Sequence, residues 1–415
     1  MNTKYTRFVL AAVIYAVFAG YLYRPYFDGF GSPRPQDLFV MNVSLASLGT
    51  YVLSRRWMAG FAESFFAGAV YGFGPYVLGL VKFHPTGVFL AAAIPWLFCP
   101  AAFGPKMRRQ RAEGTPFCKK NRKMGTQARG QRSVFRPLSS VLYVLSSVFR
   151  LPSSVLCLLP FLVIVLFFQL AGSFGLYPIP VGAVREPPLL ALLAPLVAAK
   201  RQKMLIGFYH VPLAALVMGL CMFLAPFCLV SRASCPRFEG GTPSTQKAKQ
   251  GSMLQKGKVL RDLAFRRLGI VSIFAVATVL AFCDSLLQVS PIIWLSISTL
   301  CCSVLIGLGM QGLISAGATD RNPILFTAVL MGVLAIITLL FATDCFQIAI
   351  GLGASYGRLL TETAKMYILA AAAVAMIFLI TRAKLRLHAV RRLLLCAAVA
   401  LDIFLGARFI VDTIL

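Results

Sequence analysis

The sequence predicts an all-α integral membrane protein, a polytopic bundle of about 10–12 transmembrane helices. Of its 415 residues, 59% are hydrophobic and only 13% are charged. Soluble domains carry about 25% charged residues, so this composition cannot supply a water-exposed surface. The apolar residues form continuous runs of about the 20 residues that a helix needs to cross a bilayer, without the alternation of a β-barrel strand. Lipid is therefore the solvent that the sequence predicts.

Eleven apolar stretches are candidate spans. Each is long enough, or nearly so, for a helix to cross about 30 Å of hydrocarbon. They cover about 8–23, 37–53, 58–81, 86–103, 155–177, 204–230, 270–288, 291–316, 324–342, 364–381 and 393–411.

The first four candidate spans make up an N-terminal membrane unit, 1–103. Basic residues flank them: Lys4 and Arg7 precede the first, and Arg55 and Arg56 follow the second. Because Lys and Arg concentrate in cytoplasmic loops, this pattern places the N-terminus in the cytoplasm. It also accounts for the net charge of +28, since anionic headgroups are sufficient partners for such loops. We expect no nucleic-acid partner, and a location in the plasma (inner) membrane.

The centre of the chain is less regular. Residues 104–154 combine a basic linker with a heptad repeat, in which Ser-Val recurs every seven residues. Prolines interrupt the repeat, and tandem-repeat DNA is a simpler origin for it than a coiled coil. A two-span segment, 155–230, and a basic cytoplasmic linker, 231–268, complete the centre. The apolar piece 189–199 is too short to cross comfortably and is expected to dip in or lie at the interface.

The last five spans form a C-terminal membrane unit, 269–415, whose basic tail loop around 382–392 is expected in the cytoplasm. Within it, residues 345–357 are too short for a span. A half-helix or interfacial helix, followed by a polar turn from Arg358 to Lys365, is expected there.

Ionisable residues at membrane depth are the best functional candidates, because burying a charge in hydrocarbon is costly. Glu63 is either a proton or cation ligand, or a carboxylate that reaches Arg55, Arg56 or the headgroups. Asp284 lies near the outer end of its span. Asp402 is the deepest acid and cannot meet Arg408 on one helix face, because they are six residues apart. The full set is Glu63, Asp284, Asp402, His210 and Arg408.

Small residues recur at every fourth position of the third span. Gly60, Ser64, Gly68 and Gly72 form a stripe that lets a neighbouring helix approach closely. The run 307–312 matches G-x-G-x-x-G but lies within an apolar helix, so helix packing explains it better than nucleotide binding. The G-x-S-x-G match at 353–357 has no suitable strand-to-helix context for a nucleophile.

These features favour a transport-like or membrane-scaffold role without covalent catalysis. The interrupted segments and sparse intramembrane charges are typical of transporter sites. The alternative is a membrane-embedded enzyme acting on a lipid-linked substrate at the interface, with Lys82, His84, Glu63 and Asp320 as its candidates. No catalytic residue, cofactor or metal is predicted. The eleven cysteines include no C-x-x-C pair and indicate neither a zinc site nor a disulfide framework.

Overall fold

The structure is a computed structural model of the 415-residue chain. It describes residues 3–24, 37–57, 60–83, 85–103, 157–174, 197–200, 203–206, 213, 215–220, 270–283, 289–315, 321–343, 354–383 and 388–414. The predicted repeat and basic linkers at 104–154 and 231–268 lie outside these ranges.

The described chain is almost entirely helical, as the composition predicts. Five helices are long and apolar enough to cross a membrane. Each has 21–29 residues, which suffices for about 30 Å of hydrocarbon. They are α1 (Thr3–Tyr23), α13 (Pro291–Ser315), α14 (Arg321–Ala342), α16 (Ala354–Arg382) and α17 (His388–Ile414).

The other N-terminal helices follow the predicted pattern with one break. Helix α2 covers Asp37–Trp57 and α5 covers Pro85–Phe103. The predicted span 58–81 is divided into α3 (Phe61–Gly72) and α4 (Pro75–Phe83). The break falls at Phe73 and Gly74, directly before Pro75. Proline favours the first turn of a helix and disfavours the helical conformation of the residue before it, so Pro75 opens α4 and ends α3.

The centre corrects two sequence expectations. Helix α9 covers Leu159–Ser173 within the predicted span 155–177. However, β1 (Val197–Lys200) and β2 (Lys203–Ile206) form an antiparallel pair. The predicted span 204–230 therefore does not begin as a helix, and the apolar piece 189–199 ends in a strand. The polar run Lys200–Lys203 interrupts the apolar sequence there, and the ladder satisfies the backbone groups that a helix would otherwise pair.

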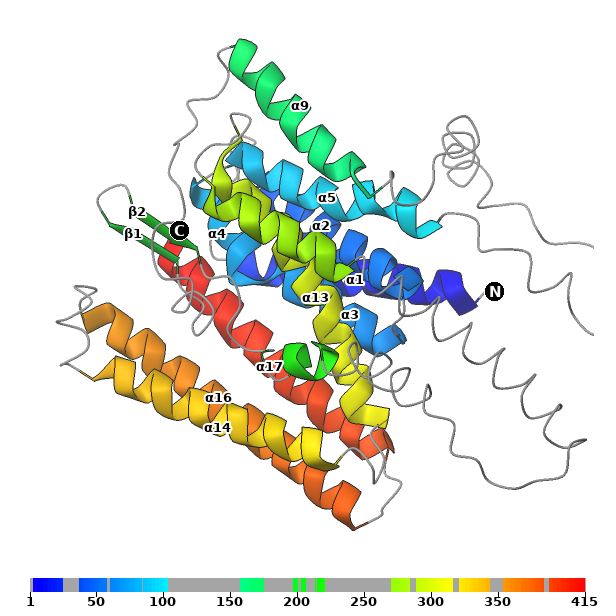
Figure 1. Ribbon diagram of the computed structural model, residues 1–415, viewed down its shortest axis with the longest axis vertical. Coiled ribbons are helices and arrows are strands. Elements are labelled where there is room, and N and C mark those ends of the chain that lie inside the picture. Colours follow the sequence, from blue (N-terminus) through cyan, green and yellow to red (C-terminus); the bar gives the residue numbers. More distant parts are fainter. Residues whose placement is uncertain are drawn as a thin grey trace, which may run out of the picture.

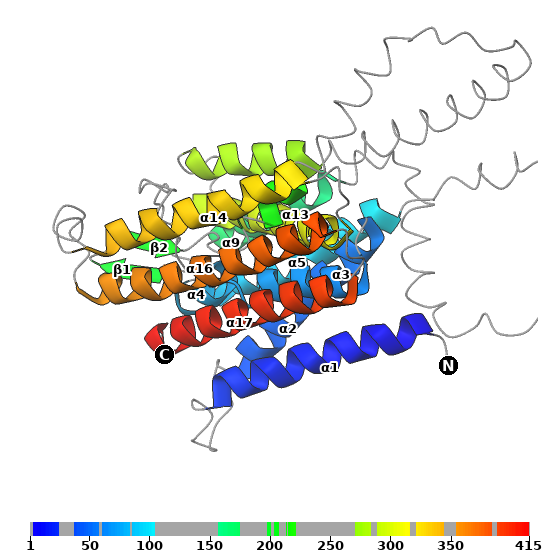
Figure 2. The same ribbon diagram turned by 90° about the horizontal axis from the view of Figure 1, so that it is seen from below.

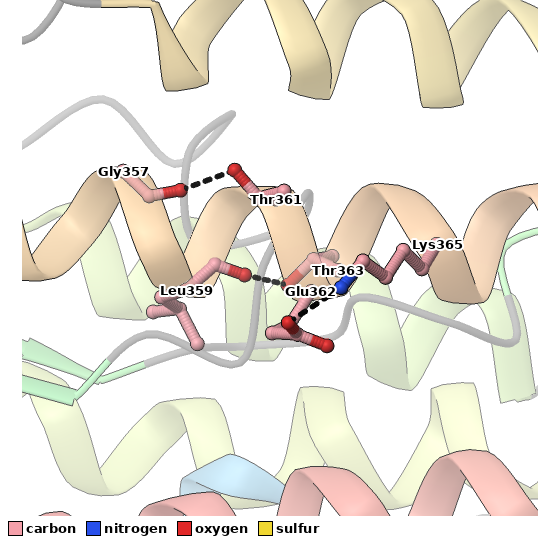
Figure 3. A network of polar contacts seen from close by, with 6 residues as sticks. All are labelled: Gly357, Leu359, Thr361, Glu362, Thr363 and Lys365. Carbon is pink, nitrogen blue, oxygen red and sulfur yellow. Dashed lines mark hydrogen bonds and ion pairs between the residues drawn. The ribbon is translucent and has the colours of Figure 1, made fainter.

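The polar turn predicted at 358–365 is not separate from the next span, whereas residues 345–353 of the predicted half-helix lie outside the described residues. Helix α16 runs without a break from Ala354 to Arg382 and includes the polar turn. Figure 3 shows why this turn is compatible with a helix. Thr361 and Thr363 donate hydrogen bonds to the carbonyls of Gly357 and Leu359, at 2.7 and 2.9 Å. Glu362 pairs with Lys365 at 2.8 Å, so the polar groups are satisfied within one helix.

Helix α13 lies at the centre of the bundle (Figure 1). In its most apolar window, 83% of the residues are buried, against 28% in α14. A helix that is apolar on all sides requires such a position. It packs against α2, α3, α5 and α17, so elements from both ends of the chain share one hydrophobic core. The division into units 1–103, 155–230 and 269–415 stays a prediction.

Helices α14 and α16 pack side by side as a hairpin at the edge of the bundle (Figures 1 and 2). Met331, Ala335 and Tyr367 form a small hydrophobic cluster of their own between these two helices. The outer faces expose large apolar side chains such as Phe326, Ile336 and Leu379. Lipid is the solvent that suits such a surface.

Candidate functional site

Glu63 occupies the first turn of α3 and is almost completely buried, with 3% of its surface exposed. Its carboxylate folds back over Gly60, where a Cβ would collide with Oε2. A negative charge in this turn is favoured by the helix dipole. The lack of a side chain at Gly60 therefore leaves the space that this carboxylate occupies.

The ion partner that the structure gives Glu63 is Arg392, near the start of α17. Oε1 of Glu63 and a terminal nitrogen of Arg392 are 3.7 Å apart. The sequence pointed instead to Arg55, Arg56 or the headgroups. Cys396, one turn further along α17, is close enough to both charges to interact with them electrostatically. The pair links the N-terminal parts of two helices from opposite ends of the chain.

Further basic side chains gather at the same end of the bundle. The guanidinium of Arg7 lies 5.8 Å from the ring centroid of Phe61, beside Glu63 in sequence. His388 Nδ1 donates to the carbonyl of Ile314 at 3.2 Å, and Arg321 donates to the carbonyl of Arg382 at 3.5 Å. These contacts bring the starts of α1, α3, α14 and α17 together with the ends of α13 and α16. We call this region the basic end.

Asp402 is the second buried carboxylate. It lies near the middle of α17 with 4% of its surface exposed. It is close enough to Tyr367 on α16 for an electrostatic interaction. The side chain lines a cavity of about 40 Å³. Neither Glu63 nor Arg392 lines this cavity, so the two carboxylates belong to separate places in the bundle.

The cavity lies between the α14–α16 hairpin and the rest of the bundle. Asp402 is the only ionisable residue among the described residues that line it, and three of the others are methionines. Its walls come from α13, α14, α16, α17 and the helix at 215–220: Ala215, Met310, Leu313, Met331, Met366, Leu369, Ala370, Ala373, Val374, Leu395, Ala398 and Val399.

The remaining ionisable candidates are not brought into this cavity. The Arg408 side chain is 65% exposed and lies 3.7 Å from Asp412, one turn away on α17. Asp284 and His210 lie outside the described residues, as do His84 and Asp320. Lys82 lies within α4, but its side chain is not among those that the structure describes.

Sequence reasoning missed Arg392 and Tyr367. Only the i, i+3, i+7 spacing of Leu395, Ala398 and Asp402 could have indicated the cavity-facing side of α17.

The small residues of α3 lie at helix crossings. Gly68 lies against the hydroxyl of Tyr15 and the backbone of Ser47, and Gly72 lies against the side chain of Ser47 and the backbone of Val43. Ser64 is buried. Close backbone approach of this kind is what small residues permit. The stripe therefore brings α3 against α2 and positions the turn that carries Glu63.

The G-x-G-x-x-G run also lies at crossings, within the continuous helix α13. A Cβ at Gly307 would lie 2.9 Å from the carbonyl oxygen of Glu63, and one at Gly309 would collide with the backbone of Ala215. A dinucleotide site requires a strand-to-helix turn, whereas this run is helical throughout.

Replacing Arg392 tests the Glu63 ion pair. Arg392→Ala leaves a buried carboxylate without this cation, and we expect a loss of about 1 kcal/mol of unfolding free energy. This loss is well below that expected for breaking a fully buried pair, about 3–5 kcal/mol, because the Arg392 side chain is 58% exposed. Reversible unfolding in mixed micelles measures it. The control is Arg408→Ala, which removes the exposed ion pair with Asp412. It should change the unfolding free energy by less than about 0.5 kcal/mol.

Among the described residues, no group of three or more His, Cys, Asp or Glu side chains could hold a metal ion. Comparisons of the chain with protein-family models, curated proteins and solved structures found no match. The two buried carboxylates, Glu63 and Asp402, are therefore the described features that bear most directly on function.

Proposed function

We propose that this chain is a multi-pass membrane protein with a transport-like role and no covalent catalysis, in which Asp402 takes up and releases a proton inside the bilayer. The observation that carries the proposal is the burial of Asp402 beside a cavity near the middle of α17. Burying a carboxylate is costly unless it is protonated or paired, so a buried acid beside a cavity is a candidate for proton exchange. Such acids mark ion and proton pathways in membrane proteins.

The surroundings of Asp402 support exchange in preference to a fixed structural role. The cavity gives the carboxylate a space that close packing would otherwise fill. The hairpin on one side of it has its own hydrophobic cluster, distinct from the main core. A small shift of α14 and α16 against α17 would change access to Asp402 without unfolding either part.

We also propose that the bundle has 10–12 spans, resides in the plasma (inner) membrane and keeps its basic end in the cytoplasm, against anionic headgroups. The gathering of Arg7, Arg321, Arg382 and Arg392 at one end supports this orientation. The two termini lie at opposite ends of the bundle (Figure 2), which within this range favours 11 spans. In spheroplasts, an impermeant maleimide should label a cysteine added after Leu415 but not one added before Thr3; the reverse result contradicts the orientation.

Proton flux tests the role of Asp402. The full chain in liposomes, with a pH-sensitive dye inside, should conduct protons under a potassium diffusion potential. Asp402→Asn keeps the shape of the side chain but cannot ionise, and we expect at least a tenfold lower flux. Asp412→Asn, at an exposed acid on the same helix, should keep the parental rate. No flux from the parent, or equal flux from Asp402→Asn, contradicts the proposal and leaves a membrane-scaffold role.

An enzyme acting on a lipid-linked substrate would need Lys82, His84 and Asp320 beside Glu63. Of these four, the structure describes the side chain of Glu63 alone, and that carboxylate pairs with Arg392. The ion pair gives Glu63 a structural partner, and no observation on the described residues favours the enzyme.

A further inference from the structure

The start of α13 carries two buried hydrogen-bond donors that have no partner among the described residues. Ser290 directly precedes the helix and Trp294 lies in its first turn, and each residue is 1% exposed. Neither the hydroxyl of Ser290 nor the indole N–H of Trp294 makes a hydrogen bond within the described chain. An unpaired buried donor is costly, so two of them at one place call for an acceptor.

Comparable donors elsewhere in the bundle have such acceptors within the chain. The indole N–H of Trp96 donates to the carbonyl of Leu45 at 3.1 Å. The hydroxyl of Ser296, also on α13 and also buried, donates to the carbonyl of Ile293 at 2.6 Å. Ser290 and Trp294 differ from these counterparts because they lie where the helix begins.

A helix N-terminus adds further donors at the same place. The first backbone N–H groups of a helix have no partner within it, and the helix dipole gives this end a partial positive charge. Ser290 and Trp294 are four residues apart and therefore share one face. Helical side chains lean toward the N-terminus, so the indole of Trp294 lies over the turn that begins at Ser290. Together these groups have the composition of an anion site.

The position of this turn allows an aqueous ion to reach it. The other end of α13 lies at the basic end, through the contact of Ile314 with His388. Because 25 residues extend over about 37 Å of helix, the first turn lies at the opposite end of the bundle, beyond most of the hydrocarbon.

We propose that the start of α13 binds chloride, held by the Ser290 hydroxyl, the Trp294 indole N–H and the first backbone N–H groups. The donors are neutral and fully buried, which favours a small monovalent anion over a phosphate with its additional charge and bulk. A spherical ion also accepts hydrogen bonds from any direction. The inference is independent of the proton role of Asp402, which lies on another helix.

Thermal unfolding of the purified full chain in detergent tests the site. A ligand of the folded state raises the melting temperature until the site is saturated. Replacing sodium gluconate by sodium chloride at constant ionic strength should raise it by at least about 2 °C, with saturation. Ser290→Ala should lose this response. Ser296→Ala, which removes a buried hydroxyl that is satisfied within α13, should keep it.

Bromide supplies a second readout at the indole itself, because this heavier halide quenches indole fluorescence on contact. The parent should show a saturable quenching component that chloride displaces. Trp294→Phe and Ser290→Ala should each lose this component, whereas Trp96→Phe should keep it. A parent without a saturable response to either halide, or a Ser290→Ala variant that responds like the parent, overturns the proposal.

Discussion

Leucine in place of Gly309 is expected to prevent α13 from packing against the helix at 215–220. A Cβ at Gly309 would collide with the carbonyl of Ala215, and one at Gly219 would collide with the carbonyl of Leu305. The contact is between two backbones, so no flexible side chain can move aside. Overpacking a core usually costs about 1–3 kcal/mol, and we expect at least the upper value here. Fluorescence-detected size-exclusion chromatography after heating measures the loss of folded protein.

Gly332 provides the matched control for this substitution. It lies in the interior of α14, and a Cβ added to it would have no other atom within 4 Å. Gly332→Leu should keep or raise the melting temperature, because glycine in a helix costs about 1 kcal/mol relative to a good helix former. If Gly309→Leu and Gly332→Leu have the same melting temperature, α13 does not pack closely against the helix at 215–220 at Gly309.

Removal of the Trp294 side chain is the second large expected effect. Trp294 is among the largest fully buried side chains, and its ring stacks on Phe161 of α9 with centroids 5.7 Å apart. Trp294→Ala should lower the unfolding free energy by about 3 kcal/mol. Much of this loss is dispersion and cavity formation, because lipid is itself apolar and transfer from water contributes less in a bilayer. Reversible unfolding in mixed micelles gives the value.

The control for Trp294 is Phe174→Ala, since the Phe174 side chain is 73% exposed. It should change stability by less than about 0.5 kcal/mol. Combining Trp294→Ala with Phe161→Ala isolates the stacking. A coupling energy of about 0.5–1.5 kcal/mol is expected for an aromatic pair. A coupling near zero would mean that α9 does not pack on α13 at this position.

Composition and the length of continuous apolar runs were sufficient to predict the helical class and most helix positions. The predicted spans 8–23, 291–316, 324–342 and 393–411 each fall on one helix with ends shifted by a few residues. The break before Pro75 also follows from local chemistry. The strand pair at 197–206 and the continuity of α16 do not, because both depend on how polar groups find partners in three dimensions.

At the candidate site, too, the sequence predicted one part and the tertiary structure supplied the other, as Asp402 shows. The sequence identified it as the deepest acid, from its distance to the ends of an apolar run. It could not supply the cavity wall, because the lining residues come from four labelled helices and the segment at 215–220. Likewise, it identified Glu63 but not Arg392, since the two are joined only when α3 and α17 pack together.

The sequence by itself determined that this chain is helical and suited to lipid, because the length of an apolar run and its lack of charge are local properties. It also pointed to Glu63 and Asp402, the two acids among its candidates that the structure buries. Only the tertiary structure decided which of them share a space. Ion pairs and cavities form between surfaces of helices that are distant in the chain, and one-dimensional spacing carries no information about that packing. Asp402 has a cavity beside it because α14, α16 and α17 meet there.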